Sequence, residues 1–208
     1  MKKALLTIVL VLLADQILKI WVKTSMNYDE SIPIFGNWFF IHFIENPGMA
    51  FGMQFGGEWG KLCLSVFRIG AVVGIAWYLR QQIQKLAPIG LVISISLIFA
   101  GAVGNIIDSA FYGVIFNESS PWETASLFPA EGGYGSLLHG KVVDMLYFPM
   151  VTGTFPIWFP VWGGEYFQFF RPVFNIADTA ISTGVGMIIV FQKRYFLHEK
   201  QSKVKTDN

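Results

Sequence analysis

The sequence lacks most of the residues on which disulfides, metal sites and common hydrolase sites depend. It contains a single cysteine, Cys63, and three isolated histidines, His42, His139 and His198. One cysteine excludes an intrachain disulfide and a cysteine-based zinc site, and we expect Cys63 to be a small buried apolar residue. No His-Glu-x-x-His motif or Gly-x-Ser-x-Gly elbow is present, so neither a histidine-based metal site nor a serine nucleophile of that kind is indicated.

Charged residues are also scarce. They make up 14% of the 208 residues, whereas soluble domains carry about 25%, and 53% of the chain is hydrophobic. The net charge is +1, and no basic stripe with interleaved aromatic residues suggests a nucleic-acid partner. The composition therefore indicates an integral membrane protein, and the length suits one compact domain over residues 1–208 without an internal repeat.

Four segments are long and apolar enough to cross a bilayer as helices. They cover about residues 4–22, 62–80, 88–107 and 173–192. The first follows two lysines, as in a secretory signal peptide. However, Asp15 and Lys19 interrupt it and no small-x-small cleavage site follows, so we expect a retained helix.

The basic residues predict how these helices are oriented. Nine of the fifteen basic residues lie at the two termini and around the 80–87 link. Only two of the fourteen acidic residues, Glu199 and Asp207, lie in the same segments. By the positive-inside rule, both termini, the 80–87 link and a basic tail over 193–208 face the cytoplasm. The nine basic residues concerned, out of fifteen, are Lys2, Lys3, Arg80, Lys85, Lys193, Arg194, Lys200, Lys203 and Lys205.

The segments that then face outward, 23–61 and 108–172, are more than linkers. Residues 32–55 are aromatic and partly alternating, with Gly and Pro between, which predicts short strands. Residues 145–172 are rich in Phe, Trp, Tyr and Pro, a composition that suits the membrane–water interface, and we expect a lid or an interface anchor. Residues 117–136 are polar and predict an exposed excursion.

Two aspartates stand in apolar surroundings. Asp144 lies in HGKVVDMLYFP, and Asp178 lies near the start of the fourth predicted span. An ionisable group in such a place is costly and is by default a candidate for function. Two carboxyl groups that converge where water is scarce separate their pKa values, so that one is ionised while the other is protonated. An aspartic protease requires such a pair.

Other polar residues fall near the same membrane boundary. Asp15 and Lys19 are four residues apart and share a helix face, where they either stabilise packing or orient a substrate or a catalytic neighbour. The third span ends, and the fourth begins, with further polar residues beside glycines that permit close approach. Polar residues from three helices at one depth indicate a single site. The further polar residues are Asn105, Asp108 and Asn175, and Gly104 is one of the glycines at the end of the third span.

Five motifs resemble, in their order, those of bacterial lipoprotein signal peptidases (signal peptidase II), and the resemblance covers about residues 10–190. The resemblance implies a membrane aspartic endopeptidase with four transmembrane helices and a small extracytoplasmic β-cradle. The motifs are Asp15-Gln16-x-x-Lys19, Asn46-x-Gly48-x-Ala50-Phe51, Gly104-Asn105-x-x-Asp108, Val142-Val143-Asp144 and Phe174-Asn175-x-Ala177-Asp178.

The resemblance also implies a substrate and a mechanism. Such enzymes cleave the signal peptide from diacylglyceryl-modified prolipoproteins at the outer face of the bacterial inner membrane, and cyclic peptides of the globomycin type inhibit them. Asp144 and Asp178 are the implied catalytic pair, and Asn175 is expected to support Asp178 from one helical turn earlier. No metal or organic cofactor is required, because one aspartate activates water and the other donates to the carbonyl oxygen. The implied supporting residues are Asp15, Lys19, Asn46, Gly48, Gly104, Asn105, Asp108 and Asn175.

The chain also departs from the family pattern. Ser109 stands at the position where the family has an arginine. The function of that arginine is either absent here or supplied by another cation, and the candidates are Arg171 and Lys141. Segments 109–140 and 145–172 fall outside the resemblance. The main alternative function is a proton-coupled small membrane transporter that uses the same buried carboxylates. The absence of a repeat and the gathering of the carboxylates at one boundary disfavour it.

Overall fold

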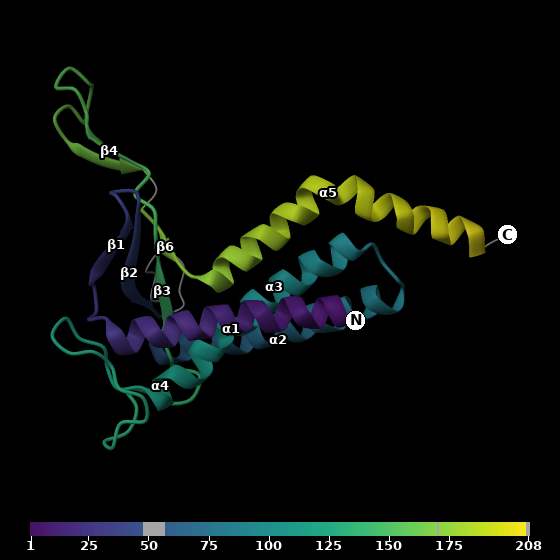
Figure 1. Ribbon diagram of the computed structural model, residues 1–208, viewed down its shortest axis with the longest axis horizontal. Helices are drawn as coiled ribbons and strands as arrows, with labels where there is room; N and C mark the ends of the chain where they lie inside the picture. The colour runs from purple at the N-terminus through teal and green to yellow at the C-terminus, as the bar shows by residue number, and fades with distance from the viewer. Residues whose placement is uncertain (48–56, 170, 207–208) are drawn as a thin grey trace.

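The protein is a helical bundle with a β-sheet at one end (Figure 1). The computed structural model describes residues 1–47, 57–169 and 171–206, so Gly48 and the rest of 48–56 lie outside the described residues. The four long helices are α1 (Lys2–Ser25), α2 (Gly57–Gln84), α3 (Ile89–Ile107) and α5 (Ile176–Thr206).

Three of the predicted membrane spans are confirmed as apolar helices of sufficient length. They are Lys2–Ser25, Leu62–Gln84 and Ile89–Ile115. Helix α5 covers most of the fourth predicted span, whose crossing of the membrane stays a prediction. Our expectation that Cys63 is buried is wrong, because its side chain is exposed on α2. In lipid, an apolar side chain gains nothing from burial within the protein, so such residues face outward freely.

The end of α3 widens into a π-helical turn, η2 (Asp108–Tyr112), followed by a short helix, α4 (Gly113–Ile115). Residues near the end of the excursion and just after it donate backbone N–H groups to carbonyl oxygens of this turn. Gly140 N donates to Ser109 O at 2.8 Å, and Gly135 N donates to Gly113 O at 2.7 Å. The excursion itself is largely exposed, as predicted, although Ala125 within it is buried.

The main sheet is antiparallel, with strand order β1-β2-β3-β6. Its first two strands, β1 (Ser31–Phe35) and β2 (Phe39–Asn46), confirm the strands predicted from residue 32 onward. The other two are β3 (Val142–Tyr147) and β6 (Val173–Phe174). The fourth span was therefore predicted to start too early, because Val173 and Phe174 pair with β3 before the helix begins.

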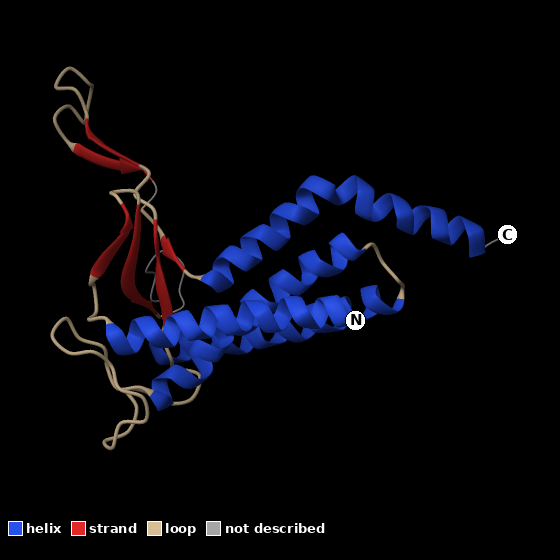
Figure 2. Ribbon diagram, viewed as in Figure 1, coloured by secondary structure: helices blue, strands red, loops and turns tan. Residues whose placement is uncertain are grey.

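A second, two-stranded sheet consists of β4 (Val151–Thr154) and β5 (Tyr166–Phe169). We call residues 151–169 the hairpin. It extends away from the helices beyond the main sheet (Figure 2).

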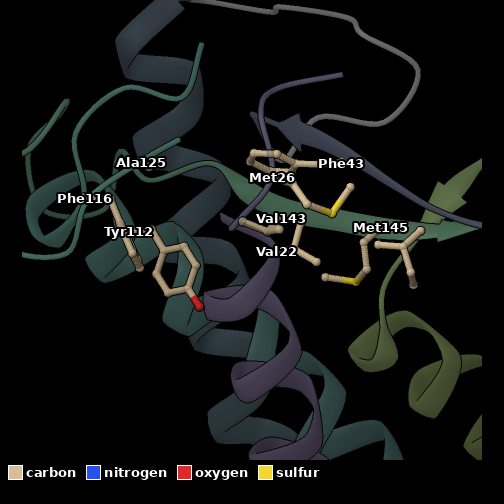
Figure 3. Close-up of a cluster of buried hydrophobic side chains, with 9 residues drawn as sticks. Val22, Met26, Phe43, Tyr112, Phe116, Ala125, Val143 and Met145 are labelled. Carbon is tan, nitrogen blue, oxygen red and sulfur yellow. The ribbon is translucent and has the colours of Figure 1, made fainter. Parts of the chain in front are cut away.

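A hydrophobic core joins the sheet to the bundle and sets the orientation of β3. Val143 and Met145 of β3 pack against Val22 of α1, Phe43 of β2 and Tyr112 of η2 (Figure 3). Because side chains alternate along a strand, burying Val143 and Met145 on this face turns Asp144 to the other. The core thus determines which way Asp144 points.

Candidate active site

Asp178 is held by a reciprocal cap at the start of α5. Asn175 Oδ1 accepts the Asp178 backbone N–H at 2.9 Å, while Asp178 Oδ2 accepts the Asn175 backbone N–H at 3.3 Å. This is the capping-box arrangement, in which two otherwise unpaired helix donors are satisfied. Asn175 thus precedes the helix instead of lying one turn earlier on it, which corrects our expectation.

Asp15 caps the same helix from a distant part of the chain. Its Oδ1 accepts the Ala177 backbone N–H at 2.8 Å. This contact needs α1, α3 and α5 to approach closely, and Gly104 permits it, since a Cβ there would lie 2.8 Å from Asp15 Oδ2. Substituting Gly104 therefore pushes on a buried carboxylate.

Lys19 is the centre of a buried ionic cluster. Its Nζ lies 2.9 Å from Asp15 Oδ2 and 2.8 Å from Asp108 Oδ2, and it donates to Asn105 Oδ1 at 2.9 Å. The side chains of Lys19, Asp15 and Asp108 are at most 1% exposed. An ammonium has three protons to donate, and Lys19 has three acceptors. The predicted pairing of Asp15 with Lys19 is confirmed, and it extends to the third helix.

Lys19 determines the orientation of the Asn105 amide. Because an ammonium only donates, the Asn105 oxygen must face it, and the Asn105 nitrogen then donates to Asp178 Oδ1 at 2.8 Å. In Asn175 the oxygen is committed to a backbone N–H, so its nitrogen donates to Asp144 Oδ1 at 2.7 Å and to Asn105 Oδ1 at 3.1 Å. The two asparagines therefore present one N–H to each aspartate.

Asp144 and Asp178 differ in their surroundings. Asp144 is only 3% exposed, and its Oδ2 accepts a long hydrogen bond of 3.4 Å from Asn46 Nδ2. Burial, followed by the charge of Asp178, raises the pKa of Asp144 to about 7. Asp178 is half-buried. The less solvated carboxyl group thus favours its protonated form, as a dyad with two distinct roles requires.

Asp108 ties β3 to the bundle. Its Oδ2 accepts the Val143 backbone N–H at 3.2 Å, and its Oδ1 accepts from Gln16 Nε2 at 3.0 Å. Gln16 also donates to Asp15 Oδ2 at 3.1 Å and accepts from the Tyr112 hydroxyl at 3.2 Å. Gln16 stands in the first motif but was not among the predicted site residues. Its signal in the sequence is an amide inside an apolar helix.

The cations near the site differ from those proposed from the sequence. Ser109 is buried, and its hydroxyl donates to Asn105 O at 3.0 Å. Lys141 forms ion pairs with Glu45 and Glu118, and Arg171 is exposed. The charge of Arg68, on α2, instead acts on Asp178. Its signal in the sequence is an arginine within an apolar span, a costly position that indicates a partner.

Of the predicted site residues, those that the structure describes gather around β3 and around the ends of α1, α3 and α5 that lie nearest the main sheet. Among the described residues, every buried side-chain nitrogen and oxygen has a hydrogen-bond partner. A membrane-embedded bundle that holds two carboxyl groups in such a network has the architecture of an intramembrane acid–base enzyme.

Comparison with known proteins identifies the family. Residues 7–193 match the family described as signal peptidase (SPase) II. A lipoprotein signal peptidase of Porphyromonas gingivalis is 50% identical over 188 residues, which cover 90% of this chain and 81% of that protein. One from Amoebophilus asiaticus is 38% identical over 192 residues, with coverage of 90% and 74%. The chain therefore belongs to the signal peptidase II family of membrane aspartic proteases and is a hydrolase.

A solved structure supports the fold. It is a bacterial membrane enzyme determined by the in meso method at 2.3 Å resolution, with a TM-score of 0.60 and 23% sequence identity. The match covers 93% of this chain and 89% of that one. At this level of identity the likeness concerns the fold alone.

Proposed function

We propose that the protein is an aspartic endopeptidase that removes signal peptides from diacylglyceryl-modified prolipoproteins at the outer face of the bacterial inner membrane. The observation that carries this proposal is the pair of asparagines that donates one N–H each to Asp144 and Asp178. Membership of the signal peptidase II family supplies the substrate class.

In the proposed mechanism the two aspartates have different roles. Asp178, ionised, takes a proton from a water molecule, whose oxygen attacks the scissile carbonyl carbon. Asp144, protonated, donates a hydrogen bond to the carbonyl oxygen as negative charge develops there. When the tetrahedral intermediate collapses, the carbon–nitrogen bond breaks and Asp178 passes the proton that it took from water to the leaving amine. The raised pKa of Asp144, about 7, supports this assignment.

The proposed topology has four crossings, with both termini in the cytoplasm. The two chain ends lie at the end of the bundle opposite the sheet, in keeping with an even number of crossings (Figure 1). The excess of basic residues at both termini indicates that this end is cytoplasmic. The dyad then lies near the outer boundary, where water is available and the diacyl chains of a substrate remain in the bilayer. Cyclic peptides of the globomycin type are expected to bind there.

The test is cleavage of a diacylglyceryl-modified prolipoprotein by purified variants. Asp144→Asn and Asp178→Asn should each lower the cleavage rate by about 1,000-fold or more, because each removes an acid–base group. Glu131→Gln, which changes an exposed acid in the excursion, is the matched control and should cleave normally. Substantial cleavage by either aspartate variant, in a protein that is folded in the membrane, would show that the dyad is assigned wrongly.

A further inference from the structure

The tip of the hairpin, residues 155–164, exposes an unusual concentration of large apolar side chains. Ile157 is 92% exposed, Trp158 80% and Val161 86%. Glu165 is the single charged residue in the whole hairpin sequence, residues 151–169. Exposed apolar patches of this kind mark surfaces that contact protein or lipid.

The tip is an ordered structure. The Phe155 ring lies 4.9 Å from the Phe159 ring and 4.7 Å from the Phe167 ring, measured between centroids. The backbone closes around them, because Phe155 N donates to Glu165 O at 2.9 Å and Gly164 N donates to Phe155 O at 2.9 Å. These rings form a small core of their own. The other large apolar side chains of the tip are therefore exposed on a folded structure.

The backbone is strained at one of the exposed residues. Val161 has a φ of 77°, a left-handed conformation that a β-branched residue rarely adopts. Strain of this kind costs on the order of 1–3 kcal/mol and is kept where the surroundings impose it. The Val161 side chain at this strained turn is exposed.

A row of stacked aromatic rings lies between the base of the hairpin and the start of α5. The Phe148 ring stacks on Phe39 at 4.5 Å and on Phe174 at 5.8 Å, and Phe174 immediately precedes the cap of α5. Gln168 Nε2 of the hairpin donates to the Tyr147 hydroxyl of β3. The hairpin is thus attached to the sheet at the level where α5 begins.

The hairpin extends to one side of the helical bundle. The helices α1, α2 and α3 run along the long axis of the molecule, whereas the hairpin extends sideways from the sheet, obliquely to that axis and away from the helices (Figure 1). If the helix axes follow the membrane normal, an element that extends sideways at one end of the bundle lies along the bilayer surface. Trp and Tyr are enriched at this interface, and the hairpin contains Trp158, Trp162 and Tyr166.

We propose that the hairpin tip inserts Ile157, Trp158 and Val161 into the bilayer leaflet nearest the sheet and so anchors the sheet on the membrane. The partner is the lipid interface itself. The nearly uncharged composition of the hairpin indicates that insertion depends on apolar burial more than on the headgroup charge. This inference rests on the membrane embedding of the chain and is independent of the proposed peptidase reaction.

The test measures the depth of a single probe. In a Cys63→Ser background, Trp158→Cys or Ile157→Cys carries an environment-sensitive fluorophore in lipid nanodiscs that hold one chain each. The matched control is Trp122→Cys, because Trp122 is 90% exposed on the polar excursion. Nitroxide groups attached near the lipid headgroups report contact with the leaflet, and aqueous iodide reports contact with water.

We expect the probes at 157 and 158 to show blue-shifted emission, quenching by the shallow nitroxide lipids and protection from iodide. The probe at 122 should show the reverse. Iodide quenching at 157 and 158 equal to that at 122 would overturn the proposal, and it is also the outcome expected if a second copy of the chain covers the tip. Protection from both quenchers would overturn it as well, because the tip would then be buried against protein, as in a lid.

Discussion

Two buried lysines, one helical turn apart on α1, belong to two polar networks with different charge balances. Lys19 and Lys23 are both fully buried. We call the first the Lys19 network; it contains Asp15, Gln16, Lys19, Asn105, Asp108, Asp144, Asn175 and Asp178. The second, the Lys23 network, contains Lys23, Glu45, Glu118, Ser119 and Lys141.

The Lys23 network is electrically balanced. Two lysines pair with two glutamates, and Ser119 Oγ accepts from Lys23 Nζ at 2.8 Å. Lys23 Nζ also lies 5.0 Å from the centre of the Tyr134 ring, a cation–π distance. This network joins α1, β2 and the excursion, and each charge in it has an opposite partner. Its composition indicates a structural role.

The Lys19 network is unbalanced. It contains four aspartates, and among the described residues the cations that interact with them are Lys19 and Arg68. Asparagine N–H groups supply the remaining stabilisation of Asp144 and Asp178. Because amide donors hold a carboxyl group without neutralising it, an aspartate held in this way keeps the ability to exchange a proton. The comparison shows what distinguishes the two networks. An excess of buried carboxyl groups held by amide donors indicates a catalytic role, whereas a charge-balanced set of ion pairs indicates a structural one.

The largest effect is expected from Lys19→Met. This change leaves Asp15 and Asp108 buried without their cation, and breaking such a cluster typically costs about 3–5 kcal/mol of unfolding free energy. The cleavage rate should also collapse, because Asn105 loses the donor that orients its amide. Thermal unfolding in detergent and the prolipoprotein assay measure the two effects. An unchanged unfolding temperature would contradict the central role of Lys19.

A smaller effect on stability, and none on the chemistry, is expected from Lys23→Met. The unfolding free energy should fall by about 3 kcal/mol, the lower end of the range for a broken buried ion pair. The loss is limited because Lys141 Nζ remains 3.4 Å from Glu45 Oε2. Cleavage per folded molecule should equal that of the unmodified enzyme. The double variant Lys23→Met with Glu45→Gln should recover part of the stability. A loss of specific activity would remove the distinction between the two networks.

Asn175→Ala tests the amide donors directly. It removes the N-cap of α5, worth about 1 kcal/mol, and the N–H donated to Asp144, so kcat/KM should fall by about 10- to 100-fold. Asn117→Ala is the matched control, since Asn117 Oδ1 accepts the Ser126 backbone N–H at 2.6 Å in the excursion. Equal activity of the two variants would contradict the role assigned to Asn175.

A pH dependence of stability should be traceable to Asp144. Burial raises the pKa of Asp144 from its ordinary 3.8 to about 7, so the folded protein retains a proton that the unfolded chain loses. Stability from this group is therefore complete below about pH 4 and is lost as the pH rises to about 7. Asp144→Asn should remove this slope from unfolding temperatures measured between pH 4 and 8. In the unmodified enzyme, kcat/KM should decline as the pH rises through about 7.

Much of the candidate site could be predicted from the sequence. Helical periodicity places Asp15 and Lys19 on one face, and the ion pair between them is present at 2.9 Å. Hydropathy places Asn105, Asp108 and Asp178 at one depth, because span boundaries are readable from composition. The family resemblance, carried by five ordered motifs, agrees with the family match over residues 7–193.

Other features depend on tertiary contacts, which the periodicity of the sequence does not reveal. Asn175 was expected within a helix, yet it caps one, because β6 pairs with β3 immediately before it. Lys141 was a candidate cation near the dyad, yet it belongs to the Lys23 network. Arg68 was not considered, because no pattern along the chain connects a residue of α2 with Asp178.

The sequence by itself determined that this protein is embedded in a membrane, which residue types gather at one end of the helical bundle, and which family it belongs to. These properties depend on composition, spacing and order along the chain. Only the tertiary structure decided which polar network each of these residues joins. It assigned Lys19 and Lys23 to separate networks and turned Asp144 away from the core that buries Val143 and Met145. The physical reason is that hydrogen-bond direction and charge balance depend on contacts between helices and strands far apart in the chain.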